Sequence, residues 1–188
     1  MKLSALYQIF LDCQSVTTDS RNCPDGSLFI ALKGESFNGN AFAKLALDSG
    51  CAFAIIDEIQ YAIEGDQRYI LVDDCLQTMQ QLANYHRRQL GTRVIGITGT
   101  NGKTTTKELI SSVLCQNHNV LYTLGNLNNH IGVPTTLLRL KPEHDLAVIE
   151  MGASHPGEIK FLCEIAEPDY GIICLLYTSP SPRDSTSS

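Results

Sequence analysis

The stretch VIGITGTNGKTTTKELI, residues 94–110, carries residue types whose spacing suits a phosphate group. Glycines let backbone N–H groups converge on an anion without interference from a Cβ atom. The apolar run before them predicts a buried strand, and the pattern after them predicts a helix whose N-terminus attracts negative charge. Lys103 would contact the outer phosphates and Thr104 would offer its hydroxyl to Mg²⁺. The predicted ATP-binding residues are Gly99, Thr100, Asn101, Gly102, Lys103, Thr104 and Thr105.

This stretch departs from the standard phosphate-loop pattern G-x-x-x-x-G-K-[ST]. Counting back from Gly102, the place of the first glycine is held by Ile97, whereas Gly96 and Gly99 stand on either side of it. The core from Gly99 to Thr104 is intact, and it has the strand and helix context that the motif requires. A glycine turn followed by a capped helix without a ligand remains the alternative at this point.

A second metal ligand is predicted in DLAVIEMGASHPGE, residues 145–158, where Glu150 follows four apolar residues. A carboxylate at the end of a buried strand points to a function, because an unpaired buried charge is costly. Thr104 and Glu150 are therefore the expected metal ligands, and Lys103 and Glu150 the expected catalytic residues. The alternative is a structural carboxylate that caps the following turn.

Neutral amides lie between these two stretches, in TLGNLNNHIGVP, residues 123–134. Side-chain amides both donate and accept hydrogen bonds, which suits a neutral or zwitterionic substrate. Asn126, Asn128 and Asn129 are therefore candidate substrate-binding residues, with turn formation as the competing explanation. His155 follows Glu150 closely and is weighed equally as a site residue and as a turn residue.

The surrounding pattern alternates strands and helices and predicts an α/β fold in two sections, with a boundary near residues 89–93. The first section is predicted to hold strands at 27–34, 51–57 and 69–74 and helices at 3–11, 40–50 and 75–91. The second is predicted to hold strands at 93–99, 119–123, 146–152 and 170–174 and helices at 103–117, near Pro134 and at 157–168. The apolar strands of the second section favour a parallel, doubly wound sheet, whose ligands lie at the carboxyl ends of the strands.

Composition limits the classes of partner. Of 188 residues, 43% are hydrophobic and 18% charged, and the net charge of −6 gives no general attraction to nucleic acid or anionic membranes. The seven cysteines are scattered without a C-x-x-C pair, which argues against disulfides or zinc and for a reducing compartment. Since we find neither a signal peptide nor a 20-residue apolar span, we expect a cytoplasmic protein.

The end of the chain breaks the alternating pattern. LLYTSPSPRDSTSS, residues 175–188, is rich in serine and proline and cannot pack a core. We expect residues 174–188 to be a non-native disordered tail that replaces the rest of a truncated sheet, with a natural disordered tail as the alternative.

The motifs together resemble the Mur ligase family of ATP-dependent amide-forming enzymes. The resemblance rests on Thr18-Asp19-Ser20-Arg21, on SLFIALKGESFNGN (27–40) and on GITGTNGKTTT (96–106), which is the family's form of the phosphate loop. It implies an N-terminal α/β substrate domain at 1–90, in which Thr18, Ser20 and Arg21 bind the UDP end of the substrate. It further implies that 91–173 is the first part of a parallel-sheet ATP-binding domain, so that the chain is an inactive fragment by itself.

YTLGNLNNHIGVPTTLL (122–138) and IEMGASHPGEI (149–159) resemble the family member that adds D-alanyl-D-alanine to UDP-N-acetylmuramoyl-tripeptide in peptidoglycan precursor synthesis. This implies ATP and Mg²⁺ as cofactors, an acyl phosphate intermediate, those two substrates and a monomer. A family member that adds the third peptide residue remains an alternative, whereas a folate polyglutamate ligase would lack the Thr18–Arg21 segment. A phosphate-loop kinase or NTPase and a nucleotide-binding module without ligase activity are the alternatives of other classes.

Overall fold

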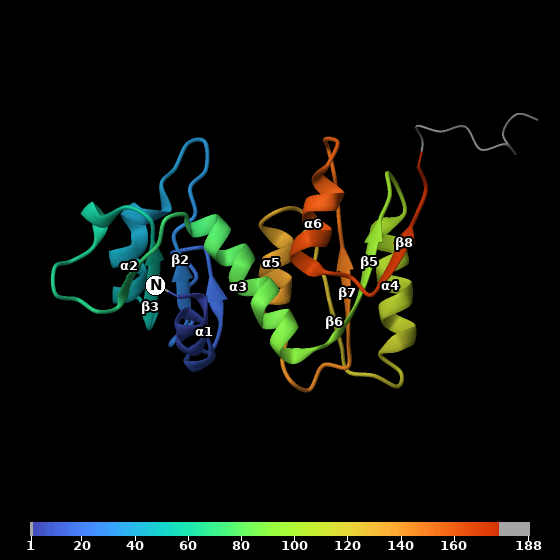
Figure 1. Ribbon diagram of the computed structural model, residues 1–188, viewed down its shortest axis with the longest axis horizontal. Helices are drawn as coiled ribbons and strands as arrows, with labels where there is room; N and C mark the ends of the chain where they lie inside the picture. Colours follow the sequence, from blue (N-terminus) through green and yellow to red (C-terminus); the bar gives the residue numbers. More distant parts are fainter. Residues whose placement is uncertain (1, 177–188) are drawn as a thin grey trace, which may run out of the picture. The chain divides into compact units, whose positions relative to one another are not determined.

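The computed structural model describes residues 2–176, which form two compact units (Figure 1). The first comprises Met1–Gln89 with Leu137–Arg139, and the second Leu90–Thr136 with the chain from Leu140 onward. Each unit is built on a four-stranded parallel sheet, so the predicted α/β class with parallel sheets is confirmed.

The sheet of the first unit has the order β1-β2-β3-β4, the same as the order along the chain. Its strands are β1 (Val16–Thr17), β2 (Leu28–Ile30), β3 (Phe53–Ile56) and β4 (Tyr69–Leu71). The β2 strand is buried along its whole length, as expected for a strand covered on both faces of a parallel sheet. The helical elements are α1 (Leu3–Asp12), η1 (Gly39–Phe42), α2 (Ala43–Asp48), η2 (Ile59–Tyr61) and α3 (Cys75–Leu90).

Helices α1 and α3 pack together through aromatic side chains. The Tyr7 ring meets Tyr85 edge to face at 5.0 Å between centroids, and Phe10 meets the buried His86 in the same manner at 4.8 Å. The Tyr7 hydroxyl lies 3.1 Å from Nδ1 of His86, so both polar groups are satisfied inside the core. His86 is thus a buried core residue.

The sheet of the second unit has the order β6-β7-β5-β8, and all its neighbours are parallel. The strands are β5 (Arg93–Thr98), β6 (Val120–Tyr122), β7 (Leu146–Glu150) and β8 (Tyr170–Ile173). The helices are α4 (Lys103–Leu114), α5 (Gly132–Leu137) and α6 (Glu158–Ala166). Right-handed crossovers in this order place α4 on one face and α5 and α6 on the other, as Figure 1 shows.

This order brings three chain segments to one edge of the second sheet. Ile97 pairs with Glu150, and Tyr122 pairs with Val148, so β5, β6 and β7 end close together. Under this edge, Ile97 and Val148 pack with Ile110 and Leu114 of α4. The loops after the three strands are therefore held on a rigid apolar base.

The predicted elements correspond to observed ones, with differences at their ends. Most predicted strands are longer than the observed ones; the first is three residues long instead of eight. The sequence did not predict β1, which has only two residues, or the short helix η2, and it predicted η1 and α2 as a single helix at 40–50.

The structure describes three residues of the predicted tail. The backbone N–H of Cys174 donates to the Thr98 carbonyl at 2.7 Å, which continues the pairing of β8 with β5. The next residue, Leu175, contacts the loop after β5. The remainder of the predicted tail, 177–188, lies outside the described residues.

Candidate active site

The predicted phosphate loop is a four-residue turn between β5 and α4. Gly99 has a φ of +142° and Gly102 a φ of +85°, conformations that other residues rarely adopt. A Cβ atom on Gly99 would lie 2.9 Å from the Cβ of Cys174, so a side chain is excluded there for a second reason. Because Ile97 is fully buried within β5, the turn begins two residues after the place of the standard motif's first glycine. The departure from the motif is thus a shorter loop.

The groups of this loop that were expected to face a phosphate have partners within the chain. The ammonium of Lys103 donates to the Gly99 carbonyl at 2.7 Å and lies 3.4 Å from that of Thr100. The backbone N–H groups of Thr100 and Asn101 both point to the Leu175 carbonyl oxygen, at 2.8 and 3.3 Å. A phosphate at these two amides would have to displace Leu175. The side chain of Thr105, the remaining predicted ATP-binding residue, is exposed on the first turn of α4.

Glu150 is the centre of a polar cluster at the end of β7. Its residue is only 1% exposed, and its two carboxylate oxygens have different partners. Thr104 donates its hydroxyl to Oε2 at 3.1 Å, and Asn128 donates its amide to Oε1 at 2.8 Å. The structure therefore brings together Thr104, Asn128 and Glu150, which the sequence nominated separately.

The donor set at Glu150 fits Mg²⁺. A hydroxyl and a carboxylate are hard oxygen ligands, and Mg²⁺ commonly combines one or two of these with water and phosphate oxygens. Within residues 2–176 no three side chains of His, Cys, Asp or Glu gather as a metal cluster. The cluster thus suits a metal that arrives with a nucleotide better than a metal held wholly by protein side chains.

The other two predicted amides have different surroundings. The Oδ1 of Asn129 accepts the backbone N–H groups of Ile131 and Gly132, at 3.1 and 2.8 Å, at the start of α5. This is the bonding of a helix cap, so Asn129 has a structural task. Asn126 is exposed, and its carbonyl accepts the backbone N–H of Asn128. Of the three amides, only Asn128 contacts Glu150.

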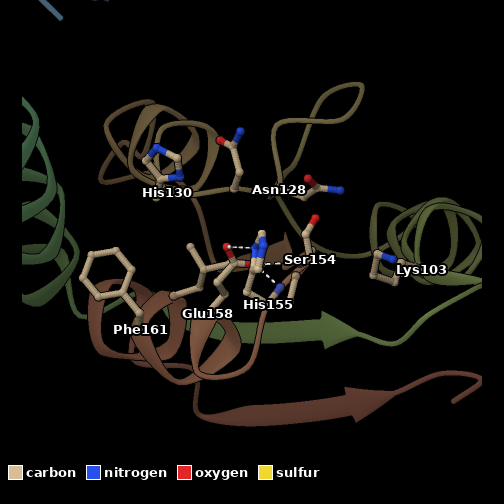
Figure 2. A pocket seen from close by; sticks show the side chains of 11 residues that line it. Lys103, Asn128, His130, Ser154, His155, Glu158 and Phe161 are labelled. Carbon is tan, nitrogen blue, oxygen red and sulfur yellow. Dashed lines mark hydrogen bonds and ion pairs between the residues drawn. The ribbon is translucent and has the colours of Figure 1, made fainter. Parts of the chain in front are cut away.

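A pocket of about 650 Å³ opens beside Lys103 and Asn128. Figure 2 shows Asn128 and His130 along one side of it, and His155 and Glu158 along the other. Glu158 accepts the backbone N–H groups of His155 and Ser154 at 3.0 and 2.6 Å, and these bonds lower the pKa of its carboxyl group. The lining residues are Lys103, Asn128, Asn129, His130, Gly152, Ala153, Ser154, His155, Glu158, Phe161 and Leu162.

The Thr18–Arg21 segment belongs to the first unit and follows β1. Arg21 donates Nε and a terminal nitrogen to the two carboxylate oxygens of Asp19, each at 2.8 Å. This pairing, with the backbone N–H of Arg21, lowers the pKa of Asp19 to about 2. The hydroxyl of Thr17 donates to the Asn22 carbonyl at 2.8 Å, and this bond joins the two ends of the turn. Thr18 and Ser20 lie in this turn and are partly exposed; their role in binding UDP stays a prediction.

Sequence reasoning missed two residues of the second unit, Lys107 and Thr123. Lys107 is 1% exposed and lies on the inner face of α4, and Thr123 is fully buried directly after β6. Helical spacing could have placed Lys107 inside, since it lies three and seven residues before the packed Ile110 and Leu114. No pattern in the sequence singles out Thr123.

Two models of one protein family match this chain. A model described as Mur ligase family, catalytic domain, matches residues 12–87, and the Mur ligase middle domain matches residues 97–179. Together the two matches include the Thr18–Arg21 turn, the phosphate loop and Glu150. The chain belongs to the Mur ligase family. The middle-domain match extends past the predicted boundary at residue 173.

Individual relatives of the Mur ligase family agree with this assignment. The chain is 46% identical over 158 residues to the UDP-N-acetylmuramoyl-tripeptide–D-alanyl-D-alanine ligase of Bacillus subtilis, and 43% identical over 159 residues to that of Escherichia coli. These matches cover 84% and 85% of this chain but 35% and 34% of the relatives. The chain thus spans about a third of the length of the curated relatives it matches.

Solved structures of the family match as well. MurF from Acinetobacter baumannii superposes with a TM-score of 0.81 at 36% identity, over 92% of this chain and 40% of that one. MurF ligase from Thermotoga maritima, solved in complex with ADP, superposes with a TM-score of 0.77 at 32% identity, over 88% and 38%. Within residues 2–176 no helix is long and apolar enough to cross a membrane.

Proposed function

We propose that this chain contributes the UDP-substrate unit and the phosphate loop of a ligase that adds D-alanyl-D-alanine to UDP-N-acetylmuramoyl-tripeptide. The observation that carries the proposal is the contact of Thr104, on the first turn after the loop, with the buried carboxylate of Glu150 at 3.1 Å. Relatives at 46% and 43% identity are named for this activity, and one similar structure contains ADP. The Thr104–Glu150 pair is where a nucleotide-borne metal would be held.

The reaction has two steps, and the described residues serve the first. The terminal carboxylate of the tripeptide attacks the γ-phosphorus of ATP, giving an acyl phosphate and ADP. The amine of D-alanyl-D-alanine then attacks the acyl carbon, and phosphate leaves. Phosphoryl transfer depends mainly on positioning and on neutralising negative charge. Lys103 and the backbone amides of 99–104 would hold the phosphates of ATP at the N-terminus of α4.

Thr104 and Glu150 would hold Mg²⁺, which neutralises charge on the phosphates when bound. Asn128 donates its amide to Oε1 of Glu150. This bond would keep the carboxylate oriented so that Oε2 faces Thr104. The adjacent pocket, lined by Asn128, Ser154 and His155, is the proposed place of the tripeptide's terminal carboxylate. Its wall offers neutral side-chain donors and the ammonium of Lys103, while the carboxylate of Glu158 is already bonded to the backbone N–H groups of Ser154 and His155.

The proposal includes a cytoplasmic location and a monomeric state. Supporting the location, all seven cysteines are free, which fits a reducing compartment. The cytoplasm would also supply the ATP and the UDP-linked substrate that the proposed reaction needs. Arg21, 87% exposed at its side chain, would turn from Asp19 to the diphosphate.

A chimera tests the proposal, since the chain covers a third of its relatives. Residues 16–173 would replace the matching segment of the Bacillus subtilis ligase, and phosphate release would be measured with UDP-N-acetylmuramoyl-tripeptide and ATP. We expect release to depend on D-alanyl-D-alanine and to disappear in Lys103→Ala. Phosphate release that instead requires a UDP-N-acetylmuramoyl-dipeptide and a single amino acid would assign the chain to a ligase of the third residue.

ADP binding by the unaltered chain provides a second, independent measurement. Isothermal titration calorimetry with Mg²⁺ and ADP should give a dissociation constant that Lys103→Ala weakens at least tenfold, because an ammonium contact to phosphate is lost. Phosphate release in the chimera that is indifferent to Lys103 would refute the loop assignment. Nucleotide binding without any ligation would support the alternative of a nucleotide-binding module.

A further inference from the structure

Lys107 is a buried cation that the proposed reaction does not use. It lies one turn after Lys103 on α4 and is 1% exposed. Burying an ammonium is costly unless it is paired, and Lys107 has two close partners. Its Nζ donates to the Thr123 carbonyl at 2.8 Å and pairs with Oε1 of Glu108 at 2.7 Å. It also lies 5.9 Å from the centre of the Tyr122 ring.

Thr123, directly after β6, bonds two other elements, α4 and β7, through its three polar groups. Its carbonyl accepts from Lys107 of α4, and its backbone N–H donates to Val148 of β7 at 3.1 Å. Its hydroxyl oxygen accepts the backbone N–H of Glu150 at 2.9 Å. Thr123 is completely buried and precedes the loop that carries Asn128. Any shift of Thr123 would therefore be passed to the backbone of Glu150.

These contacts close a ring. The carboxylate of Glu150 accepts a hydrogen bond from the Thr104 hydroxyl. Thr104 lies on α4, three residues before Lys107. The ring Lys107–Thr123–Glu150–Thr104 thus fixes the end of β7 against the helix that begins at the phosphate loop. We propose that Lys107, acting through Thr123, is a positioning residue that sets the Glu150 carboxylate at the proposed metal-nucleotide site.

Stability alone does not account for a lysine at this place. An apolar residue of the same length would fill the space beside Tyr122, and replacing a buried ion pair with apolar groups is often neutral or stabilising. A methionine could not hold the Thr123 carbonyl. What distinguishes lysine here is a directional bond to the residue that bonds the backbone of Glu150.

The inference rests on the proposed function, since it assigns Glu150 to a metal-nucleotide site, and Lys107→Met tests it in the unaltered chain. The first readout is the ratio of the ADP dissociation constants without and with Mg²⁺, obtained by calorimetry. We expect Lys107→Met to reduce this ratio about tenfold, as loss of a group that orients a metal ligand does. Affinity for ADP in EDTA should stay unchanged, because the loop amides and Lys103 are intact. A merely structural loss would weaken both affinities together.

The second readout is amide hydrogen exchange at Glu150, which needs no nucleotide. Lys107→Met and Thr123→Val should both raise its exchange rate at least tenfold, since each removes one bond of the ring. The exposed Lys160→Met is the matched control, because it removes an ammonium that contacts neither Lys107 nor Thr123, and it should leave the rate unchanged.

The outcomes separate the two proposals. Unchanged exchange at Glu150 in Lys107→Met overturns the positioning role, and so does an unchanged magnesium ratio. Faster exchange together with failure of the unaltered chain to bind ADP supports the positioning of Glu150 and refutes the nucleotide assignment. If Lys107→Met does not fold, Thr123→Val carries both measurements, with the same expected results.

Discussion

The two predicted anion sites of this chain are both satisfied internally, but by different partners. In the first unit, Arg21 donates two charged hydrogen bonds of 2.8 Å to the carboxylate of Asp19. In the second, the amides of Thr100 and Asn101 bond one neutral carbonyl, that of Leu175. A carboxylate is a full negative charge, whereas a carbonyl is only a dipole. A phosphate should therefore displace Leu175 more readily than it displaces Asp19.

A third turn sharpens this comparison. Arg68 and Asp66 repeat the Asp-x-Arg arrangement, with the same backbone bond at 3.0 Å and a closest nitrogen–oxygen distance of 2.7 Å. No ligand site was predicted there. The pairing of Asp19 with Arg21 is thus what an Asp-x-Arg turn forms locally, and it is not itself a sign of UDP binding.

The largest difference between the two regions should be in stability. Glu150→Ala removes a carboxylate that is 1% exposed and leaves the half-buried Asn128 amide and the Thr104 hydroxyl without their acceptor. We expect the free energy of unfolding to fall by about 2–4 kcal/mol, from unsatisfied groups and a small cavity. The measurement is urea denaturation followed by far-UV circular dichroism.

Asp19→Ala is the matched variant, because it also removes one carboxylate that has two partners. Its side chain is 45% exposed, so water can replace the lost bonds, and we expect a much smaller shift of the denaturation midpoint than in Glu150→Ala. Equal losses in the two variants would show that burial of the cluster at Glu150 has no energetic consequence.

A smaller effect is expected where the phosphate loop meets Leu175. A chain shortened to end at Ile173 loses the acceptor of two loop amides. Its affinity for ADP should rise about three- to tenfold. ADP would no longer have to break the bonds between the loop amides and Leu175, which cost roughly the free energy of one hydrogen bond. Calorimetry measures this, and a chain ending at Leu176 serves as the control because it keeps the acceptor. Equal dissociation constants would mean that Leu175 does not compete with phosphate.

The sequence predicted what depends on local pattern. The apolar run before Gly99 and the helix after Gly102 follow from residue types alone, and so does the buried carboxylate of Glu150. Parallel order followed from the alternation of strands and helices, which places those residues at one edge of the sheet.

The remainder depends on contacts between residues far apart in the chain. Which of three neighbouring asparagines faces Glu150 is decided by the turn after β6, where Asn129 caps α5 and Asn128 is left to point inward. The bond of Lys107 to Thr123 spans 16 residues, and that of Glu150 to Thr123 spans 27. The place of Leu175 over the loop lies in a segment that the composition indicated as disordered.

The smallest effect on stability, and the sharpest local test, concerns Arg21. The guanidinium of Arg21 holds the pKa of Asp19 at about 2, below the ordinary carboxyl value near 4. The stabilising contribution of this pair is therefore complete above about pH 4, and it is lost as the pH falls through about 2. Arg21→Ala should return the pKa of Asp19 toward about 3.9, which carbon-13 NMR of the side-chain carboxyl group measures directly. Arg68→Ala is the control: it should raise the lowered pKa of Asp66 and leave that of Asp19 unchanged. If UDP binds Arg21 as proposed, adding UDP to the unaltered chain should also raise the pKa of Asp19. An unchanged pKa of Asp19 would show that Arg21 does not bind UDP.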